Sequence, residues 1–258
     1  MTPGEAVPRR AAGIILLRDS AAGGIEVFMS TRIGPGSGPG ALVFPGGKVD
    51  EDDRITDGAS PSNGKDPLRV DAIAAIRETW EEVGILFARS VATGSLVDAD
   101  SLAAIRARHA DAYASATLPF SALLAREGLE PATDRLAYFA HWISPDTAPR
   151  RFDTRFFLAS CPLDQAPAHD GREMGDGFWI KPADAFEAAL SGRFEAVFPT
   201  KRKLAKLSRY GSVDDAFAHA RGTPVVTVQA VITRTPTGRI LRIPAEAGYD
   251  GAEFEERS

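Results

Sequence analysis

The chain has 258 residues, of which 44% are hydrophobic and 25% are charged, and its formal net charge at pH 7 is -5. This balance excludes a disordered, collagen-like or coiled-coil protein, and the negative charge argues against nucleic-acid binding by bulk electrostatics. The length favours one enlarged α/β domain, which we expect to span residues 1–258.

The hydrophobic pattern predicts alternating strands and helices. In chain order we expect strands at 11–19 and 25–32, a Gly/Pro-rich loop at 33–40, a short apolar segment at 41–44, an exposed insertion at 54–65 and a helix at 66–83. The rest of the chain predicts helices at 99–109 and 121–126, strands at 135–143, 152–159 and 178–180, helices at 182–190, 200–209 and 213–220, and strands at 225–232 and 240–243.

The sequence has no pattern typical of a secreted or membrane protein. Its best apolar run, Ala11 to Leu17, falls far short of the ~20 residues that a membrane span needs. The start of the chain has no apolar stretch followed by a small-residue cleavage site. The single cysteine, Cys161, cannot form an internal disulfide, which fits a reducing compartment. We therefore expect a cytoplasmic protein without membrane or nucleic-acid partners.

The helix at 66–83 has the best-defined ends of the predicted elements. Asp66 is expected to be its N-cap and Pro67 its first residue, and Gly84 is expected to end it. At ~100° per residue, one face of this helix collects the apolar side chains of Ala72, Ile73, Ile76, Trp80 and Val83. The opposite face collects the carboxylates of Asp71, Glu78, Glu81 and Glu82.

So many carboxylates on one face need a positive charge nearby, because like charges one helical turn apart repel each other. Arg77 lies four residues before Glu81 and is predicted to hold that carboxylate in place. Clusters of oxygen ligands suit Mg²⁺ or Mn²⁺. The alternative is a solvated acidic face. The upstream pair Gly46 and Gly47 favours a site instead, because glycine lets the backbone approach a metal or ligand closely.

Together these residues resemble the signature of the Nudix hydrolase family, which is Gly, five residues, an acid, a spacer, and then Arg-Glu-x-x-Glu-Glu-x-Gly. Gly47 is followed after five residues by Asp53, and the second half, RETWEEVG, begins at Arg77. The chain departs from the pattern in three ways. Asp53 replaces the usual Glu, Thr79 stands at a position that is usually aliphatic or small, and the spacer contains the insertion at 54–65.

The resemblance implies an α/β/α sandwich with a mixed sheet, extra C-terminal helices and strands, and a Nudix box at residues 47–85 that contains the insertion. It also implies an Mg²⁺- or Mn²⁺-dependent diphosphohydrolase that acts on a nucleoside diphosphate linked to another moiety. In that case Glu78 and Glu82, with Gly47, would hold the metals. Glu81 would be a further metal ligand or the base that activates water.

Other candidate residues follow from the same resemblance. Arg77 would support catalysis. Glu173 is a second candidate base, because Asp170-x-x-Glu173 resembles the family's late acidic loop, and a solvated loop acid is the alternative. Arg32 and Lys48 are the basic residues nearest the proposed site and are candidates for substrate binding, as is Phe44 of the FPGG run.

A longer likeness, to the peroxisomal coenzyme A diphosphatase branch of the family, rests on the insertion and on the segments FPGGKVDEDD, HWISP and RFDTRFFL. Arg32 and the FPGG run fit that branch. The second arginine expected between them is absent, and the last residues are not Ser-Lys-Leu. Coenzyme A or an acyl derivative is thus the first substrate expected. The alternatives are a non-catalytic Nudix-fold nucleotide sensor, or a pyrophosphatase acting on NADH, ADP-ribose or nucleoside triphosphates. Whether the protein is a homodimer stays open.

Overall fold

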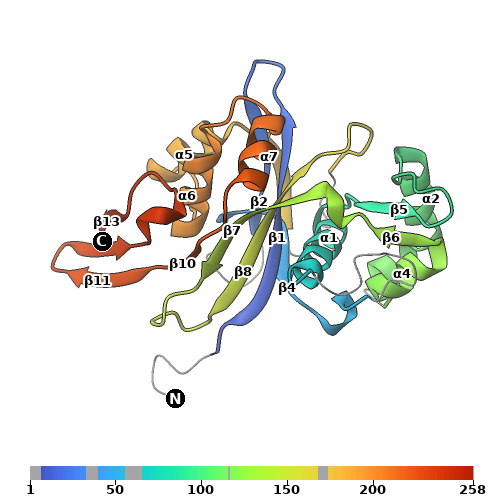
Figure 1. Ribbon diagram of the computed structural model, residues 1–258, viewed down its shortest axis with the longest axis horizontal. Helices are drawn as coiled ribbons and strands as arrows, with labels where there is room; N and C mark the ends of the chain where they lie inside the picture. The colour runs from blue at the N-terminus through green and yellow to red at the C-terminus, as the bar shows by residue number, and fades with distance from the viewer. Residues whose placement is uncertain (1–6, 33–39, 56–65, 116, 168–173, 258) are drawn as a thin grey trace.

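The computed structural model describes residues 7–32, 40–55, 66–115, 117–167 and 174–257 (Figure 1). Within them, the main sheet contains β1 (Arg9–Asp19), β2 (Ile25–Arg32), β3 (Leu42–Val43), β4 (Gly46–Lys48), β7 (Leu136–Ile143), β8 (Phe152–Ser160), β9 (Met174–Ile180) and β10 (Thr227–Gln229). The strand order is β10-β7-β8-β1-β2-β3, while β4 pairs with β1 and β9 with β2. Because β1 and β8 are parallel and β1 and β2 antiparallel, the sheet is mixed, as expected.

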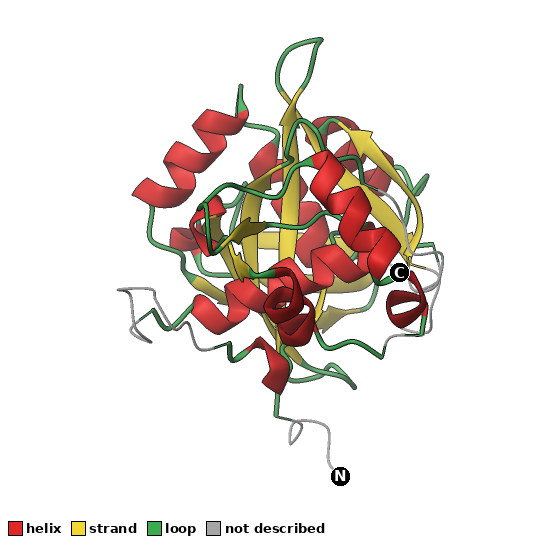
Figure 2. Cartoon of the chain, turned by 90° about the vertical axis from the view of Figure 1, so that its right-hand side faces the viewer, coloured by secondary structure: helices red, strands yellow, loops and turns green. Residues whose placement is uncertain are grey.

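Helices cover both faces of this sheet, and together they make the expected α/β/α sandwich (Figures 1 and 2). One face carries α1 (Arg69–Val83). The other carries α5 (Pro182–Leu190), α6 (Phe198–Leu207) and α7 (Val213–Gly222). None of the helices within the described ranges is both long enough and apolar enough to span a bilayer.

The central strand β1 shows why the sequence builds this arrangement. Its residues alternate between the two faces, so that Ile14 and Leu16 join the core under α1, whereas Ile15 and Leu17 join the core under α6 and α7. All four are completely buried. A strand covered on both faces has a continuous apolar sequence rather than an alternating one, which is what this segment shows.

Helix α1 confirms most of its prediction and corrects its start. It begins at Arg69 with Leu68 as N-cap, because Asp66 instead accepts a hydrogen bond from the Leu68 amide, at 2.9 Å, and closes a turn that contains Pro67. Its C-cap is Gly84 in the left-handed conformation, with φ 67°, as predicted. The predicted apolar stripe is buried along its whole length.

The chain adds two smaller sheets to the sandwich. Beside α1 lie β5 (Ala88–Ser90), α2 (Ala99–Arg108), α3 (Ala110–Ala114), α4 (Phe120–Glu127) and β6 (Leu129–Pro131), in which β5 and β6 pair with each other. The C-terminal part forms a three-stranded sheet from β11 (Val231–Thr235), β12 (Gly238–Arg242) and β13 (Glu253–Arg257). Short 3₁₀ helices are η1 (Glu51–Asp53), η2 (Thr133–Arg135) and η3 (Ala245–Ala247).

Several boundaries differ from the prediction, and each difference reflects tertiary pairing. The single strand expected at 225–232 is two strands, because β10 pairs with β7 in the main sheet while β11 pairs with β12. Strand β13 was not predicted. Its sequence is mostly charged, and its Phe254 packs on Phe198 of α6, with ring centroids 5.2 Å apart. The insertion expected at 54–65 falls mainly outside the described residues.

Candidate active site

The glycine corner, Gly46 and Gly47, packs tightly against β1. Gly46 has φ 154°, and a side-chain Cβ there would lie 2.5 Å from the Ala12 carbonyl oxygen and 2.6 Å from the Gly13 Cα. The preceding carbonyl, that of Pro45, accepts a hydrogen bond from the Ile14 amide at 2.9 Å. Only glycine fits at position 46, so the corner is held in one place on the sheet.

Two glutamates of α1 meet the glycine corner. The Gly46 amide donates a 2.7 Å hydrogen bond to Glu82 Oε2. A Cβ on Gly47 would lie 2.5 Å from both carboxylate oxygens of Glu78, so the missing side chain leaves the space that Glu78 fills. Glu78 and Glu82 lie one helical turn apart, and the predicted acidic face of the helix therefore approaches this corner.

Arg77 binds three carboxylates around the same corner. Its Nη1 donates to Glu78 Oε1 and to Glu81 Oε2, each at 2.9 Å, which confirms the predicted contact with Glu81. Its Nε donates to Asp53 Oδ1 at 2.8 Å, and its Nη2 donates to the Lys48 carbonyl at 2.8 Å. The guanidinium thus joins the acidic helix to the segment that follows the glycine corner.

Asp53, which replaces the usual Glu of the signature, contacts Arg77. It is completely buried, and its Oδ2 accepts hydrogen bonds from the Asp50 amide at 2.7 Å and from Arg77 Nη2 at 3.1 Å. Asp50 and Asp53 form a capping box on η1. With both oxygens occupied, Asp53 positions Arg77.

The group carries more negative than positive charge. Burial raises the pKa of Glu78 to about 7, and the nearby Glu81 adds to the rise, while Arg77 opposes it. Burial alone would lower the pKa of Arg77, but its hydrogen bond to Asp53 and the surrounding carboxylates outweigh burial and raise that pKa. A single guanidinium therefore faces several carboxylates, which favours the approach of a further cation.

The side chains at the corner fit a hard divalent cation in their chemistry. Among the residues that the structure describes, no three Asp, Glu, His or Cys side chains converge as a metal site requires. Arg77 Nη1 instead binds Glu78 and Glu81 together. The donors are all oxygens, and the absence of a side chain at Gly47 lets the Glu78 carboxylate lie against the backbone there. These two features suit Mg²⁺ or Mn²⁺.

The candidate substrate-binding residues lie in different places. Lys48 is exposed beside the glycine corner, and Arg32 is half-buried at the end of β2, where its amide donates to the Ala41 carbonyl at 3.1 Å. Phe44 is buried in the core on the face opposite α1, with its ring edge-on to Phe156 at 6.3 Å. Glu173 lies outside the described residues.

Asp71 does not belong to the acidic group in which the sequence placed it. It is completely buried, and its two oxygens accept hydrogen bonds from Arg10 Nε and Nη2 at 2.6 and 2.7 Å. Arg155 of β8 forms a second ion pair with it, at 3.4 Å. Sequence reasoning missed both arginines, because residues so distant in sequence meet only through the packing of α1 on the sheet and the pairing of β1 with β8.

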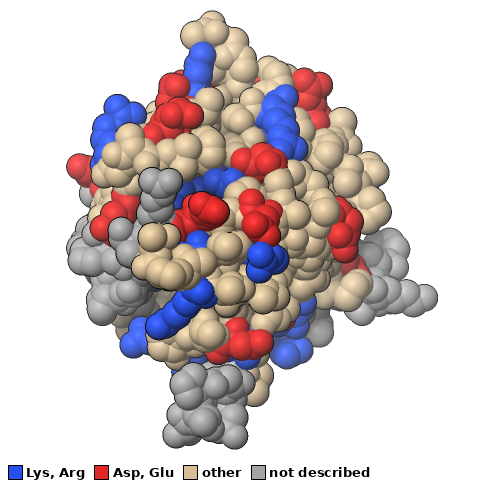
Figure 3. All heavy atoms as spheres, turned by 90° about the vertical axis from the view of Figure 1, so that its left-hand side faces the viewer, with Lys and Arg blue, Asp and Glu red and all other residues tan. Residues whose placement is uncertain are grey.

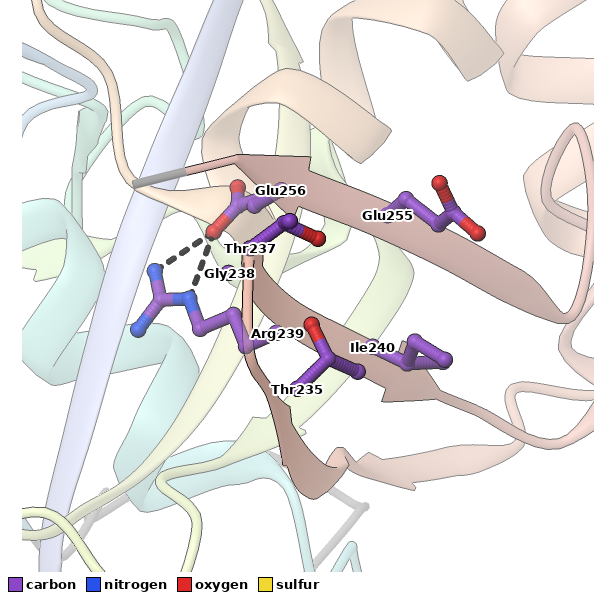
Figure 4. Close-up of a pocket in the computed structure, with 7 residues that line it drawn as sticks. All are labelled: Thr235, Thr237, Gly238, Arg239, Ile240, Glu255 and Glu256. Atoms are coloured by element: carbon purple, nitrogen blue, oxygen red, sulfur yellow. Dashed lines mark hydrogen bonds and ion pairs between the residues drawn. The ribbon is translucent and has the colours of Figure 1, made fainter.

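Two other surface features give no support for a second functional site. Figure 4 shows a small pocket of about 100 Å³ in the C-terminal sheet, where Arg239 pairs with Glu256, and none of the predicted site residues lines it. On the face shown in Figure 3, basic and acidic side chains are interspersed. That face has no continuous basic stripe of the kind that binds nucleic acid.

Comparisons with known proteins identify the family of the chain. The family described as the NUDT19 Nudix domain matches residues 64–199. Putative nudix hydrolase 7 of Caenorhabditis elegans is 29% identical over 175 residues, which cover 66% of this chain and 51% of that protein. Acyl-coenzyme A diphosphatase NUDT19 of Gallus gallus is 30% identical over 163 residues, which cover 55% of this chain and 42% of that protein.

A solved structure is similar over most of the chain. The crystal structure of a NUDIX hydrolase from Alicyclobacillus acidocaldarius superposes with a TM-score of 0.69 at 28% identity, and the alignment covers 85% of this chain and 100% of that one. The matched regions span about half of the worm relative and less of the chicken relative. Since the family match alone covers more than half of the sequence, this chain belongs to the Nudix hydrolase family.

Proposed function

We propose that this protein is a divalent-metal-dependent diphosphohydrolase that cleaves a nucleoside diphosphate linked to another moiety, and that residues 1–258 act as one enlarged domain. The observation that carries the proposal is the contact of Glu78 and Glu82 with the glycine corner, organised by Arg77. The three side chains come from α1 and the glycine backbone comes from β4, and η1 lies between the two elements in the chain.

Each residue at the glycine corner has a separate role in this proposal. Glu78 and Glu82, with the backbone of Gly47, would hold Mg²⁺ or Mn²⁺, which supplies charge neutralisation for the diphosphate and activates water. Glu81 is the most exposed of the three glutamates, with 44% of its side chain accessible, which suits a base that takes a proton from water. Arg77 positions Glu78 and Glu81.

The substrate would lie on the exposed side of the glycine corner. Lys48 projects from this corner into solvent and is the candidate for pairing with a phosphate oxygen. Arg32 remains a second candidate. Phe44 packs beneath the corner on the opposite face of the sheet, so it would act on the substrate by supporting Pro45 and the glycines. Glu173 stays a prediction as the alternative base.

Coenzyme A or an acyl-coenzyme A is the first substrate class that we propose. The name of the chicken relative supports it, as does the match to the NUDT19 Nudix domain. NADH, ADP-ribose and nucleoside triphosphates are the other candidates, and a non-catalytic nucleotide sensor is the alternative from a different class. A cytoplasmic location and a homodimer also stay proposals.

A hydrolysis panel tests the function directly. Coenzyme A, acyl-coenzyme A, NADH, ADP-ribose and nucleoside triphosphates are each incubated with the protein and Mg²⁺ or Mn²⁺, and the products are separated by chromatography. We expect metal-dependent cleavage of the diphosphate in coenzyme A or its acyl form. Tight nucleotide binding without turnover on any compound would instead identify a sensor.

Substituting Gly47 by Ala is expected to weaken metal affinity and turnover by about 10-fold or more. The new Cβ would lie 2.5 Å from the Glu78 carboxylate and would push that side chain away from the corner. Because a flexible side chain yields, the fold should persist, and Mn²⁺ titration together with kcat checks the effect. Gly222→Ala is the control, since no atom lies within 4 Å of a Cβ placed there. Equal metal affinity in the two variants would contradict the assignment.

A further inference from the structure

One row of residues crosses five neighbouring strands of the main sheet at the same level. The register pairs Gly47 of β4 with Ala12 of β1, and Ala12 with Arg155 of β8. It continues from Arg155 to His141 of β7, and from His141 to Thr227 of β10. Neighbouring strands lie ~4.8 Å apart, so the Cα atoms of Gly47 and Arg155 are roughly 10 Å apart. The row therefore connects the glycine corner with a polar part of the sheet.

The charged members of this row lie on the same face of the sheet as the candidate active site. Arg155 Nε is 3.4 Å from an oxygen of Asp71, which belongs to α1, the helix that also carries Glu78. His141 Nε2 hydrogen-bonds to Asp153, two residues before Arg155, and its Nδ1 lies 2.8 Å from the Thr227 hydroxyl. Because side chains two residues apart in a strand share a face, this whole group faces the side of α1.

The buried carboxylate of Asp71 serves two guanidinium groups. Arg10 binds both of its oxygens and Arg155 forms the second ion pair, so two guanidinium groups meet at one carboxylate, and Asp153, which pairs with Arg155, supplies the second negative charge. Both arginines reach the surface, with 38% and 18% of their side chains accessible. Nη1 of Arg155 donates to Asp153 at 3.2 Å, whereas its Nη2 donates to no residue in the described ranges.

This arrangement has the properties of a phosphate-binding site. A guanidinium presents paired donors that match the oxygens of a phosphate, and a buried carboxylate beneath it fixes its orientation. Arg10 Nη2 also donates to the Pro67 carbonyl at 3.4 Å, and both side chains remain partly exposed to solvent. Asp153 contacts both His141 and Arg155, so its role here is to position the Arg155 guanidinium.

We propose that Arg10 and Arg155 bind a phosphate monoester carried on the ribose of the nucleotide substrate, separate from the diphosphate that is cleaved. The inference rests on the proposed function, which places the diphosphate at the glycine corner. In a ribose joined to that diphosphate through its 5′ carbon, the 2′ and 3′ hydroxyl groups lie only a few bonds from the diphosphate. A phosphate on one of them could therefore reach the two arginines. The two arginines would thus select nucleotides with an additional phosphate.

The first test is binding without a metal, which does not depend on turnover. Isothermal titration calorimetry compares adenosine 3′,5′-bisphosphate with AMP. We expect the wild type to bind the bisphosphate about 10-fold more tightly, and Arg155→Gln to lose that preference. Arg242→Gln is the matched control, because Arg242 is a half-exposed arginine paired with Glu253 in the C-terminal sheet, and it should keep the preference. Arg155→Lys keeps the positive charge but loses the paired donors of the guanidinium, so it should retain part of the preference for the bisphosphate.

The second test uses substrates that differ by one phosphate, namely coenzyme A against dephospho-coenzyme A and NADPH against NADH. Arg155→Gln should raise KM about 10-fold for the phosphorylated member of a pair, with kcat and the KM of the other member nearly unchanged. A loss of structural integrity alone would affect both members equally.

The outcomes separate the two proposals. Equal wild-type affinity for the bisphosphate and AMP, or an unchanged preference in Arg155→Gln, would overturn the phosphate site even if metal-dependent hydrolysis is observed. If the preference for the bisphosphate over AMP depends on Arg155 but no compound is hydrolysed, the phosphate site is supported and the proposed function is overturned. Should Arg155→Gln fail to fold, the wild-type comparison and Arg155→Lys still decide.

Discussion

Glu82→Gln is expected to lower kcat by about 100-fold or more, with little change in thermal stability. Glutamine has nearly the same shape and keeps an oxygen that can accept the hydrogen bond from the Gly46 amide, which is 2.7 Å long in the wild type. What it loses is the negative charge that a divalent cation needs. Steady-state turnover with Mg²⁺ and with Mn²⁺, together with the melting temperature, measures the two effects separately.

The comparison with Glu81→Gln distinguishes a metal ligand from a base. If Glu82 holds the metal, its variant should bind Mn²⁺ more weakly. If Glu81 is the base, its variant should lose turnover but keep most of the Mn²⁺ affinity. Glu187→Gln, at an exposed position of α5, is the control and should behave as the wild type. Near-wild-type metal-dependent turnover in both Glu81→Gln and Glu82→Gln would reject these assignments.

Arg77→Met is expected to destabilise the fold by about 3–5 kcal/mol, because removing one partner of a buried ion pair leaves the other charge without compensation. Arg77 is only 8% exposed and Asp53 is completely buried. The variant also removes the hydrogen bond to the Lys48 carbonyl and frees Glu78 and Glu81 to repel each other. Urea unfolding followed by circular dichroism measures the loss.

A second substitution checks the cause of this loss. Adding Asp53→Asn to Arg77→Met removes the buried charge and should recover part of the lost stability, which a double-mutant cycle quantifies. Arg242→Met provides the surface comparison, because its ion pair with Glu253 is half-exposed and should contribute less than about 1 kcal/mol. If Arg77→Met proved as stable as Arg242→Met, the buried pair would not be what holds η1 to α1.

The helix that carries the site could be predicted from the sequence in most of its details. The helical period predicts the apolar stripe of α1 and the contact between Arg77 and Glu81. The end of the helix follows from Gly84, which takes the left-handed conformation of a C-cap. Each of these features depends on residues within a few turns. The start of the helix was missed by a few residues, because a turn that contains Asp66 and Pro67 precedes it. Local geometry is thus what made the glutamate face predictable.

Contacts between distant segments could not be predicted in the same way. Asp71 shares a helical face with Glu78, yet it binds Arg10 and Arg155, which arrive beside it only because β1 pairs with β8. Phe44 precedes the glycine corner by two residues, but its ring lies on the opposite face of the sheet.

The sequence alone therefore determined the family, the acidic helix and its glycine-rich partner segment, since these depend on residue order and helical spacing. The tertiary structure decided that Asp53 holds Arg77, that Glu82 binds the Gly46 amide, and that Arg155 lies two strand spacings, or roughly 10 Å, from Gly47. The physical reason is strand register. Which residues face each other across a sheet depends on how its strands pair, and the pairing of strands as far apart in the chain as β1 and β8 forms only in the folded structure.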